Sequence, residues 1–369
     1  MKILHLIYDD LNNPWVGGGG AVRVYEIYRR LSKRHRVVVV TANYPGAKNE
    51  KKDGIKYVRI GWGKNYFLSR ISYILSVPKW IRRIEHDILI EDISPYSPTF
   101  VSLYTKKPCI ALIHVLFSNF TTDLKKRLSL ARRFFCPLFE RLNLRQHKNF
   151  ICVSQNVKIG LEKLSPKIRK AIVIPNGVND SLFTSESKEE KYVLFLGRID
   201  IAQKGIDILI KAFSELVKTY KEIKLIIAGD GRNLGKVKDL VKELDLEFCV
   251  EFTGRVSKDR KRELLSKCLF LCIPSRYESH PLVVLEAYAC GKAVIGTNVP
   301  RLRNMILNGE TGILVKPDSP KELFKAMSKL IEDAHLRKRL GENGRRLARK
   351  YNWNEIAKEQ ERFYYQCLK

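Results

Sequence analysis

The sequence has no run of 18 or more apolar residues, so no segment is predicted to span a membrane as a helix. It also has no Cys-x-x-Cys spacing, although it contains eight cysteines, several inside apolar runs such as Phe150–Val153. Buried thiols in a reducing cytosol are therefore expected, and no metal site is predicted. No signal-peptide pattern precedes the first strand-like run, Ile3–Ile7. We expect a cytoplasmic protein that is at most peripheral to the inner face of the cell membrane.

Acidic residues are scarce relative to basic ones. The chain holds 39 Asp and Glu against 68 Lys and Arg, a net charge of +29. The excess is concentrated in residues 1–175, which carry 32 basic and 12 acidic side chains. Such an imbalance is typical of a surface that meets nucleic acid, anionic lipid or phosphate-bearing ligands. A solvated, lysine-rich surface is the alternative.

The length of 369 residues and a hydrophobic fraction of 45% favour two α/β domains. Short apolar runs alternate with amphipathic helical patterns, as expected for parallel sheets covered on both faces. In the first half, strands are predicted at 3–7, 37–41, 55–60, 88–91, 109–114 and 150–154, with a helix at 21–31. In the second half, strands are predicted at 192–197, 224–229, 249–253, 269–273 and 293–296, with a helix at 206–220.

These patterns predict two doubly wound, Rossmann-like domains that face a cleft. We place the first domain at residues 1–175 and the second at 176–350, with a polar linker at 179–190. A last helix within 351–369 is expected to cross back to the first domain. Ligands of such sheets bind at the carboxyl ends of the strands, so functional motifs should lie at strand-to-helix junctions.

Two such junctions carry residues suited to anions. The run Gly17–Gly20 follows the first strand, and glycines allow close approach of a ligand to a helix N-terminus. Its spacing differs from the Gly-x-Gly-x-x-Gly dinucleotide fingerprint. In the second half, Arg198 follows a strand and Lys204 precedes a helix. An arginine and a lysine at one turn suit a diphosphate.

A third junction follows the strand at 269–273. Glu278 stands just before a helix predicted to begin at Pro281, and Glu286 lies within that helix. The first free backbone N–H groups, those of Leu282 and Val283, should point out of the helix end toward a ligand oxygen. Two carboxylates placed in this way can bind two different polyol segments of one ligand.

Together these motifs resemble the retaining glycosyltransferases of family four, also called group 1, which have the GT-B fold. The resemblance covers nearly the whole chain. It includes the glycine loop, Ile174–Val178, Ala228–Gly231, Phe252–Val256 and the Glu, seven residues, Glu pattern of Glu278 and Glu286. One departure is His280-Pro281, where many relatives carry an aromatic residue and a glycine.

The resemblance implies metal-independent transfer of a hexose, with retention, from a nucleotide sugar to a glycan or lipid-linked acceptor. The donor would be a UDP- or GDP-sugar used as a co-substrate, with no cofactor. Catalytic roles are implied for His114, Arg198, Lys204 and Glu278. Donor contacts are implied for Gly18, Gly19, Arg198, Lys204, Gly229, Arg255, Val256, Glu278, Leu282, Val283 and Glu286. Arg198 and Lys204 would hold the diphosphate, Glu278 the sugar, Glu286 the ribose and the backbone near Arg255 the base.

Two features at the carboxyl ends of first-half strands have open interpretations. His114 ends the strand at 110–113 and matches a histidine that faces the transferred sugar in the family, or it is a satisfied strand-end side chain. The pair Glu91-Asp92 orients an acceptor hydroxyl or caps its loop through Ser94.

Two basic segments, Tyr66–Arg83 and Leu124–Arg145, mix cations with aromatic and aliphatic residues, and Pro137 should kink or divide the second. They suit interfacial helices on anionic lipid, or their apolar residues are ordinary core. The alternatives to a glycosyltransferase are another enzyme of the same architecture, such as a nucleotide-sugar epimerase, and a nucleic-acid-binding protein. No nucleic-acid-recognition signature supports the latter.

Overall fold

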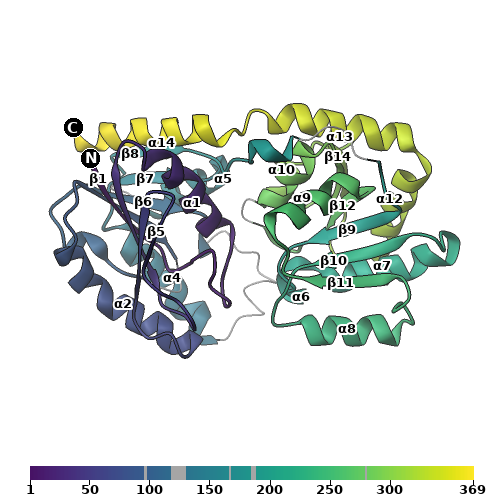
Figure 1. Ribbon diagram of the computed structural model, residues 1–369, viewed down its shortest axis with the longest axis horizontal. Helices are drawn as coiled ribbons and strands as arrows, with labels where there is room; N and C mark the ends of the chain where they lie inside the picture. The colour runs from purple at the N-terminus through teal and green to yellow at the C-terminus, as the bar shows by residue number, and fades with distance from the viewer. Residues whose placement is uncertain (95–97, 118–129, 166–167, 184–187, 279–280) are drawn as a thin grey trace. The chain divides into compact units, whose positions relative to one another are not determined.

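A computed structural model describes residues 1–94, 98–117, 130–165, 168–183, 188–278 and 281–369; the side chains of 130–132 are also outside the description. The chain divides into two compact units, residues 1–176 with 353–369, and residues 177–352 (Figure 1). Within the described residues, no helix is long and apolar enough to cross a membrane.

The first unit is built on an eight-stranded sheet in the order β3-β4-β2-β1-β5-β6-β7-β8. Every neighbouring pair is parallel except β3 with β4. The strands are β1 (Lys2–Leu6), β2 (Arg36–Ala42), β3 (Glu50–Lys52), β4 (Ile55–Ile60), β5 (Ile88–Ile93), β6 (Cys109–Ile113), β7 (Asn149–Cys152) and β8 (Lys170–Val173). The antiparallel strand β3 was not predicted, because it contains only charged residues and all three are exposed.

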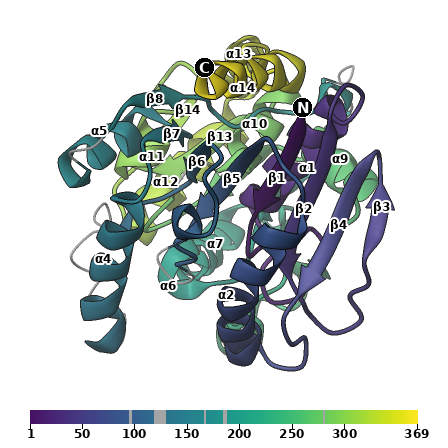
Figure 2. The same cartoon turned by 90° about the vertical axis from the view of Figure 1, so that its left-hand side faces the viewer.

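The helices of the first unit are α1 (Gly19–Leu31), α2 (Tyr66–Arg83), α4 (Leu130–Leu144), α5 (Gln155–Leu164) and α14 (Trp353–Leu368), with a 3₁₀ turn η1 (Val101–Leu103). Helix α14 packs on α1, so the C-terminal segment belongs to the first unit. Helix α2 contacts β2 and β4, whereas α4 contacts β5 (Figure 2).

The second unit has a six-stranded, wholly parallel sheet in the order β11-β10-β9-β12-β13-β14. The strands are β9 (Tyr192–Leu196), β10 (Lys224–Ala228), β11 (Val250–Gly254), β12 (Phe270–Ile273), β13 (Ala293–Thr297) and β14 (Gly312–Val315). The helices are α6 (Ile201–Lys204), α7 (Ile206–Thr219), α8 (Leu234–Glu243), α9 (Lys258–Lys267), α10 (Leu282–Ala289), α11 (Pro300–Arg303), α12 (Pro320–Glu332) and α13 (Ala334–Ala348), with a 3₁₀ turn η3 (Asp180–Leu182). Strand β14 was not predicted.

This second sheet is buried on both faces, which explains why its strands read as continuous apolar runs. Val193 and Phe195 of β9 join one core with α7 and α12, while Tyr192 and Leu194 join the other with α10. The predicted α/β fold with two parallel-sheet domains is confirmed.

The units meet in sequence at Asn176–Gly177, ahead of the polar stretch 179–190 that we expected to be the linker. Val178 and Leu182 are instead buried in the second unit's core, and Val178 N donates to Tyr351 O at 2.8 Å. The burial of Val178 and Leu182 therefore places the start of this segment in the second unit, despite the polar composition of 179–190.

Candidate active site

The turn after β9 holds two of the predicted cations of the second unit. Arg198 is exposed, and its Nη2 donates to Gln203 Oε1 at 2.8 Å. Asp200 caps the short helix α6 by accepting a hydrogen bond from Gln203 N at 3.1 Å. Lys204 at the end of α6 places its Nζ 2.5 Å from Oε1 of Glu278. The structure thus brings Lys204 and Glu278, which are 74 residues apart in sequence, into direct contact.

The turn after β12 is fastened to this first turn through the backbone. Arg276 N donates to Gln203 O at 2.8 Å. Gly205 has φ +60°, and a Cβ there would lie 2.1 Å from Pro274 O, so only glycine allows the two turns to approach so closely. Glu278 is 3% exposed, and its Oε1 also accepts from Ser275 Oγ at 2.7 Å. Lys204 and Glu278 therefore stand on one stiff pair of turns.

Arg276 does not belong to this site, although it is in the same turn. Its guanidinium forms a bidentate pair with Asp207 at 2.8 and 2.9 Å. It also donates to Asp318 Oδ1 and to Ile201 O, both at 2.5 Å. These contacts make Arg276 a structural brace of the β12 turn.

Helix α10 begins one residue later than predicted. Pro281 is the residue before the helix and has ψ 107°, so Leu282 and Val283 are its first two residues. The first backbone hydrogen bond at this end, within the described residues, runs from Val284 N to Pro281 O at 3.2 Å. The N–H groups of Leu282 and Val283 precede that bond, at the end of a helix where backbone donors lack partners within the helix. His280 lies outside the described residues.

Glu286 lies one and a half turns into α10 and forms an ion pair with Lys261 of α9 through Oε1. Lys261 was not predicted, because α9 is rich in charged residues throughout and no pattern distinguishes this lysine from the others. Each member of the Glu, seven residues, Glu pattern therefore holds a lysine from a different element: Lys204 for Glu278 and Lys261 for Glu286.

The remaining predicted residues of this unit follow the carboxyl ends of β10 and β11. Gly229 has φ +149°, and a Cβ there would lie 1.9 Å from Gly197 O, so this turn packs directly on the end of β9. Arg255 Nε lies 3.8 Å from Asp230 Oδ2, and Val256 packs partly against the core. Because β9 to β12 are parallel neighbours, all predicted residues of the second unit lie at one edge of its sheet.

In the first unit, the glycine run forms the start of α1. Gly18 is the residue before the helix and Gly19 its first residue. The Gly18 N–H donates to Asp9 Oδ2 at 2.9 Å. Burial raises the pKa of Asp9 to about 6, and the hydrogen bonds from Gly18 and Asp10 oppose that rise. Asp9 was not predicted, although its place just beyond β1 is the signal that could have found it.

His114 lies just beyond β6, next to this loop. A Cβ at Gly20 would lie 3.4 Å from His114 Nε2, so the glycine run leaves room for the ring. Nε2 is also 3.2 Å from Asp92 Oδ1, an ion-pair distance without the alignment of a hydrogen bond. The other oxygen of Asp92 accepts from His5 Nε2 at 3.2 Å. Burial alone would raise the pKa of Asp92, but His114 and His5 outweigh it and hold that pKa well below its ordinary value.

The two members of the pair Glu91-Asp92 have different partners. Glu91 is buried and accepts from Asn143 Nδ2 at 2.9 Å and His147 Nε2 at 2.7 Å, and also from the Thr99 hydroxyl. These bonds anchor α4 to the sheet and use both oxygens of the Glu91 carboxylate. Asp92 alone faces the strand-end histidine.

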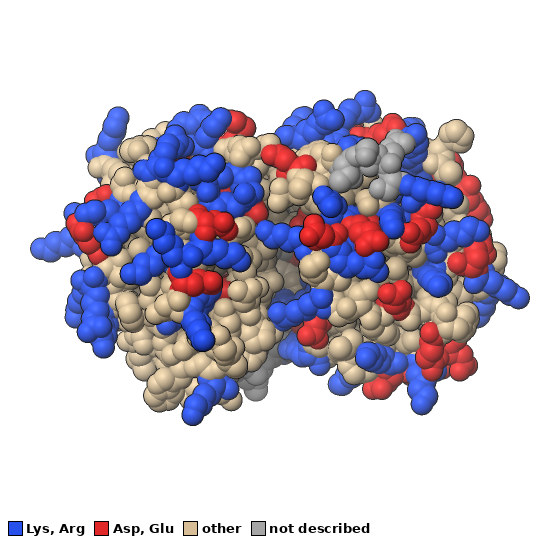
Figure 3. Space-filling model, viewed as in Figure 1, with Lys and Arg blue, Asp and Glu red and all other residues tan. Residues whose placement is uncertain are grey.

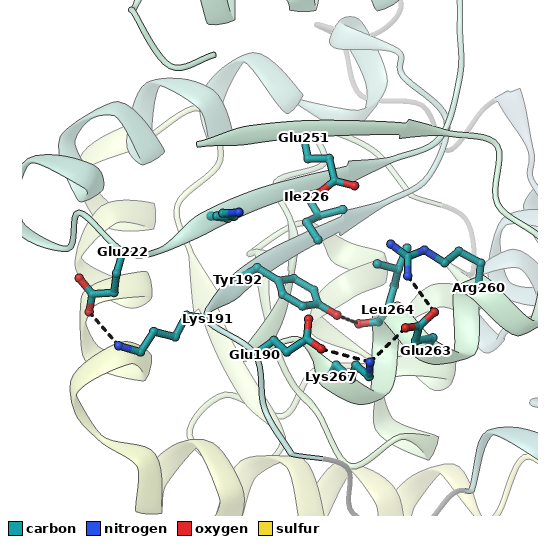
Figure 4. Close-up of a pocket in the computed structure, with 11 residues that line it drawn as sticks. Glu190, Lys191, Tyr192, Glu222, Ile226, Glu251, Arg260, Glu263, Leu264 and Lys267 are labelled. Atoms are coloured by element: carbon teal, nitrogen blue, oxygen red, sulfur yellow. Dashed lines mark hydrogen bonds and ion pairs between the residues drawn. The ribbon is translucent and has the colours of Figure 1, made fainter. Parts of the chain in front are cut away.

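A separate surface cavity of about 290 Å³ lies at the opposite, amino-terminal edge of the second sheet (Figure 4). Its charged side chains pair with one another: Lys267 with Glu190 and Glu263, and Lys191 with Glu222. No predicted site residue lines it.

Comparison with known proteins gives family matches along most of the chain. Residues 17–182 match the family described as Glycosyltransferase Family 4, and residues 180–347 match Glycosyl transferases group 1. The chain is a group 1 glycosyltransferase. That membership decides against the nucleic-acid-binding and epimerase alternatives.

Relatives of this glycosyltransferase extend over most of its length. An uncharacterized glycosyltransferase of Methanocaldococcus jannaschii is 29% identical over 97% of each chain. A phosphatidyl-myo-inositol mannosyltransferase of Mycobacterium tuberculosis is 27% identical over 78% of this chain and 76% of its own. Among solved structures, the glycosyltransferase resembles sucrose-phosphate synthase from Thermosynechococcus elongatus, with a TM-score of 0.83, 20% identity and coverage of 99% and 98%. It also resembles HepE from Anabaena in complex with UDP-glucose, with a TM-score of 0.78, 18% identity and coverage of 99% and 100%. These structures share the GT-B fold.

Proposed function

We propose that this enzyme transfers a hexose from a UDP- or GDP-sugar to a lipid-linked or glycan acceptor, with retention of configuration and without a metal ion. The observation that carries the donor site is the contact of Lys204 with Glu278, on two turns that are bonded together beside Arg198. This contact places a cation suited to a diphosphate next to a carboxylate suited to sugar hydroxyls.

Arg198 and Lys204 take the place that a metal ion would have at the leaving diphosphate. Negative charge develops on the diphosphate as the glycosidic bond breaks, and fixed cations placed there lower the barrier. Both hydrogen bonds to Glu278 that we describe use Oε1, so Oε2 is the oxygen expected to accept from a sugar hydroxyl. The N–H groups of Leu282 and Val283 offer further donors to the phosphates.

Glu286 is the proposed ribose-binding group, and Arg255 with Val256 the proposed surface for the base. The Lys261 contact holds Glu286 through Oε1, so Oε2 is the oxygen proposed to receive the ribose hydroxyls. In the first unit, Gly18 and Gly19 supply a helix N-terminus for the phosphates, and His114 faces the transferred sugar. HepE has been solved with UDP-glucose, which supports a nucleotide-sugar donor.

The donor is identified by a thermal-shift screen against UDP-, GDP- and ADP-sugars. A ligand at 100 times its Kd stabilises the folded state by about 2.7 kcal/mol, which is readily measured. The anomeric configuration of the product, read by proton NMR, tests retention. Assays with and without EDTA test metal independence. Inversion, or activity lost to EDTA and restored by a divalent ion, would contradict the corresponding part of the proposal.

The acceptor is proposed to lie at an anionic lipid surface, on the first unit. Helix α2 buries Ser69, Tyr73, Val77 and Ile81 but leaves Phe67 and Leu75 67% and 73% exposed. Helix α4 likewise exposes Phe134, Phe135, Leu138 and Leu142. Apolar side chains therefore lie on the solvent side of both helices as well as in the core. Residues 124–129 of the predicted basic segment lie outside the described part, and α4 continues through Pro137.

Cations accompany these exposed apolar groups. Arg82 and Arg83 on α2, and Arg141 and Arg145 near the end of α4, are exposed. Figures 1 and 2 both show the two helices in the lower half of the first unit, and Figure 3 shows few acidic side chains on the visible face of that unit. The mannosyltransferase relative is named for a phosphatidyl-inositol substrate, which supports a lipid-linked acceptor.

Liposome co-sedimentation tests the membrane part. Vesicles with anionic lipid should bind the protein and neutral ones should not, because each nearby Lys or Arg contributes about 1 kcal/mol. Arg82→Glu with Arg141→Glu should weaken binding, whereas Lys218→Glu on α7 of the second unit should not. Phe67→Ser should remove the part of the binding that survives high salt. Equal binding to both vesicle types, or none to either, would leave the charge as a solvated surface.

A further inference from the structure

A continuous chain of buried polar side chains runs through the first unit, and the proposed chemistry does not use most of it. It connects six residues: Arg23 and Tyr28 of α1, Gln360 and Tyr364 of α14, His5 of β1 and Asp92 of β5. The consecutive contacts are Arg23 Nη2 to Gln360 Oε1 at 2.7 Å, Gln360 Nε2 to Tyr364 Oη at 2.6 Å, Tyr364 Oη to Tyr28 Oη at 2.9 Å, Tyr28 Oη to His5 Nδ1 at 2.8 Å and His5 Nε2 to Asp92 Oδ2 at 3.2 Å.

The two ends of the chain fix the direction of every hydrogen bond in it. A guanidinium only donates, so Gln360 must turn its carbonyl oxygen to Arg23 and its amide N–H₂ to Tyr364. The Tyr364 oxygen accepts that bond and its hydroxyl donates to Tyr28. At the other end an ionised carboxylate only accepts, so a neutral His5 carries its proton on Nε2 toward Asp92 and accepts from Tyr28 at Nδ1. All donors point from Arg23 to Asp92.

The chain therefore connects a buried cation to a buried anion. Arg23, Tyr28 and His5 are fully buried, and Gln360 and Tyr364 nearly so. Burial lowers the pKa of Arg23 to about 10, which still leaves it charged at neutral pH. Burial also raises the pKa of Tyr364 to about 12, so that hydroxyl keeps its proton. Neutral hydrogen-bonding groups between opposite charges polarise one another in the same direction. Reversing one hydrogen bond in the series would leave two donors facing each other.

One end of this hydrogen-bonded chain lies where the polypeptide passes between the units, and the other lies beside His114. Arg23 Nη1 donates to Pro175 O at 2.6 Å and to Asn176 Oδ1 at 3.0 Å. These are the last two residues of the first unit before the polypeptide enters the second. Gln360 and Tyr364 belong to α14, which begins where the chain returns at Trp353. At the far end, the second oxygen of Asp92 lies 3.2 Å from His114 Nε2.

We propose that Arg23 is a positioning residue for His114. The hydrogen bonds, all directed from Arg23 to Asp92, link this histidine to both polypeptide segments that lead from one unit to the other. The proposal rests on the proposed role of His114 in transfer. Asp92 is held by His5 on one oxygen and so presents the other to His114. This arrangement favours the His114 tautomer with its proton on Nε2, which leaves Nδ1 as an acceptor for a substrate hydroxyl.

Tyr364→Phe tests the proposal at the middle of the chain, because it deletes one hydroxyl and keeps the packed ring. We expect kcat to fall roughly 2- to 30-fold, the range that coupling through a side-chain network produces. The KM for the donor should change less than kcat, since most of the proposed donor residues, among them Arg198, Lys204, Glu278 and Glu286, belong to the second unit. Tyr365→Phe is the matched control: its ring is 48% exposed on the same helix, and kcat should not change.

A double-mutant cycle separates positioning from general destabilisation. If the chain acts through His114, Tyr364→Phe should lower kcat less than 2-fold in a His114→Ala background. Nitrogen-15 NMR of labelled histidines gives a second readout, because Tyr364→Phe should shift the ring nitrogens of His5 and His114 and Tyr365→Phe should not. Arg23→Met should act in the same direction as Tyr364→Phe if it folds, with Arg23→Lys recovering part of the loss.

The possible failures are distinguishable. If His114→Ala keeps wild-type turnover, the proposed role of His114 fails and the positioning proposal fails with it. If His114→Ala loses turnover but Tyr364→Phe does not, or if the two losses multiply independently, the proposed function stands and the chain is only structural. Unchanged histidine resonances in Tyr364→Phe would also overturn the proposal.

Discussion

Removing the charge of Lys204 should separate its catalytic contribution from its structural one. Lys204→Met keeps the length of the side chain but leaves Glu278 without the cation 2.5 Å away. Breaking a buried ion pair in this way costs about 3–5 kcal/mol. Here the Ser275 hydroxyl still donates to the same oxygen, and the Lys204 side chain is 17% exposed. We therefore expect a loss of about 2 kcal/mol in the free energy of unfolding.

The catalytic effect should be larger than the loss of stability explains. Removing one preorganised donor from a site of developing negative charge lowers turnover by about 10²–10³-fold. The double variant Lys204→Met/Glu278→Gln removes the unpaired charge, so the free energy of unfolding should largely recover while transfer stays low. Lys218→Met on α7, whose exposed lysine pairs with Glu215 on the same helix, is the control and should change neither quantity.

Urea unfolding and steady-state transfer assays measure the two effects. If the double variant regains activity together with stability, the loss in Lys204→Met came from the fold, and the assignment of Lys204 to the leaving group is wrong. Folded Lys204→Met with kcat within threefold of the wild-type value would refute it equally.

Other predictions concern the remaining site residues. Glu286→Ala and Arg198→Ala should each reduce transfer to the detection limit without changing the circular dichroism spectrum, and wild-type turnover in either would remove that residue from the donor site. His114→Ala should lower kcat strongly while nucleotide binding measured by calorimetry stays within threefold; equal turnover would make His114 structural. Burial raises the pKa of Asp9 from 3.8 to about 6, so the folded protein binds this proton more tightly than the unfolded chain. The free energy of unfolding should therefore fall as pH rises from 4 through 6, and Asp9→Asn should flatten that part of the curve in urea titrations; an identical curve would contradict the shift.

The sequence predicted those parts of the site that are local to a strand end. Arg198, Lys204 and Glu278 follow β9 and β12, and parallel neighbouring strands bring such residues to one edge without further information. The start of α10 was misplaced by one residue, because proline is compatible with both the first helical position and the one before it. The strands β3, β8 and β14 were missed; β3 in particular is a wholly exposed edge strand with no apolar pattern.

Residues whose partners come from distant elements could not be predicted. Arg23 reads as one of several arginines on an amphipathic helix, yet it is fully buried because Gln360 and Asn176 receive it. His5 sits inside an apolar strand, where a lone histidine indicates burial but not its partners. The partners of Glu91 could not be predicted for the same reason, since Asn143 and His147 come from α4 and the turn after it.

The two glutamates of the proposed donor site illustrate how ion pairs can orient side chains before a ligand binds. Glu278 and Glu286 are expected to bind hydroxyls, which are neutral, yet each holds a lysine. Without its lysine, a buried carboxylate such as Glu278 would carry an uncompensated charge, and an unpaired lysine would sample many rotamers. In the proposed donor site, this pairing would orient both groups before the donor binds, so that the diphosphate would meet a cation already in place and little reorganisation would remain for the reaction. The lysine then has two anions to interact with, and the glutamate keeps its second oxygen for the sugar. Preorganisation at this edge therefore comes from the contacts between turns, and Gly205 and Gly229, where a Cβ would meet Pro274 O and Gly197 O, are as necessary to the site as the charged residues.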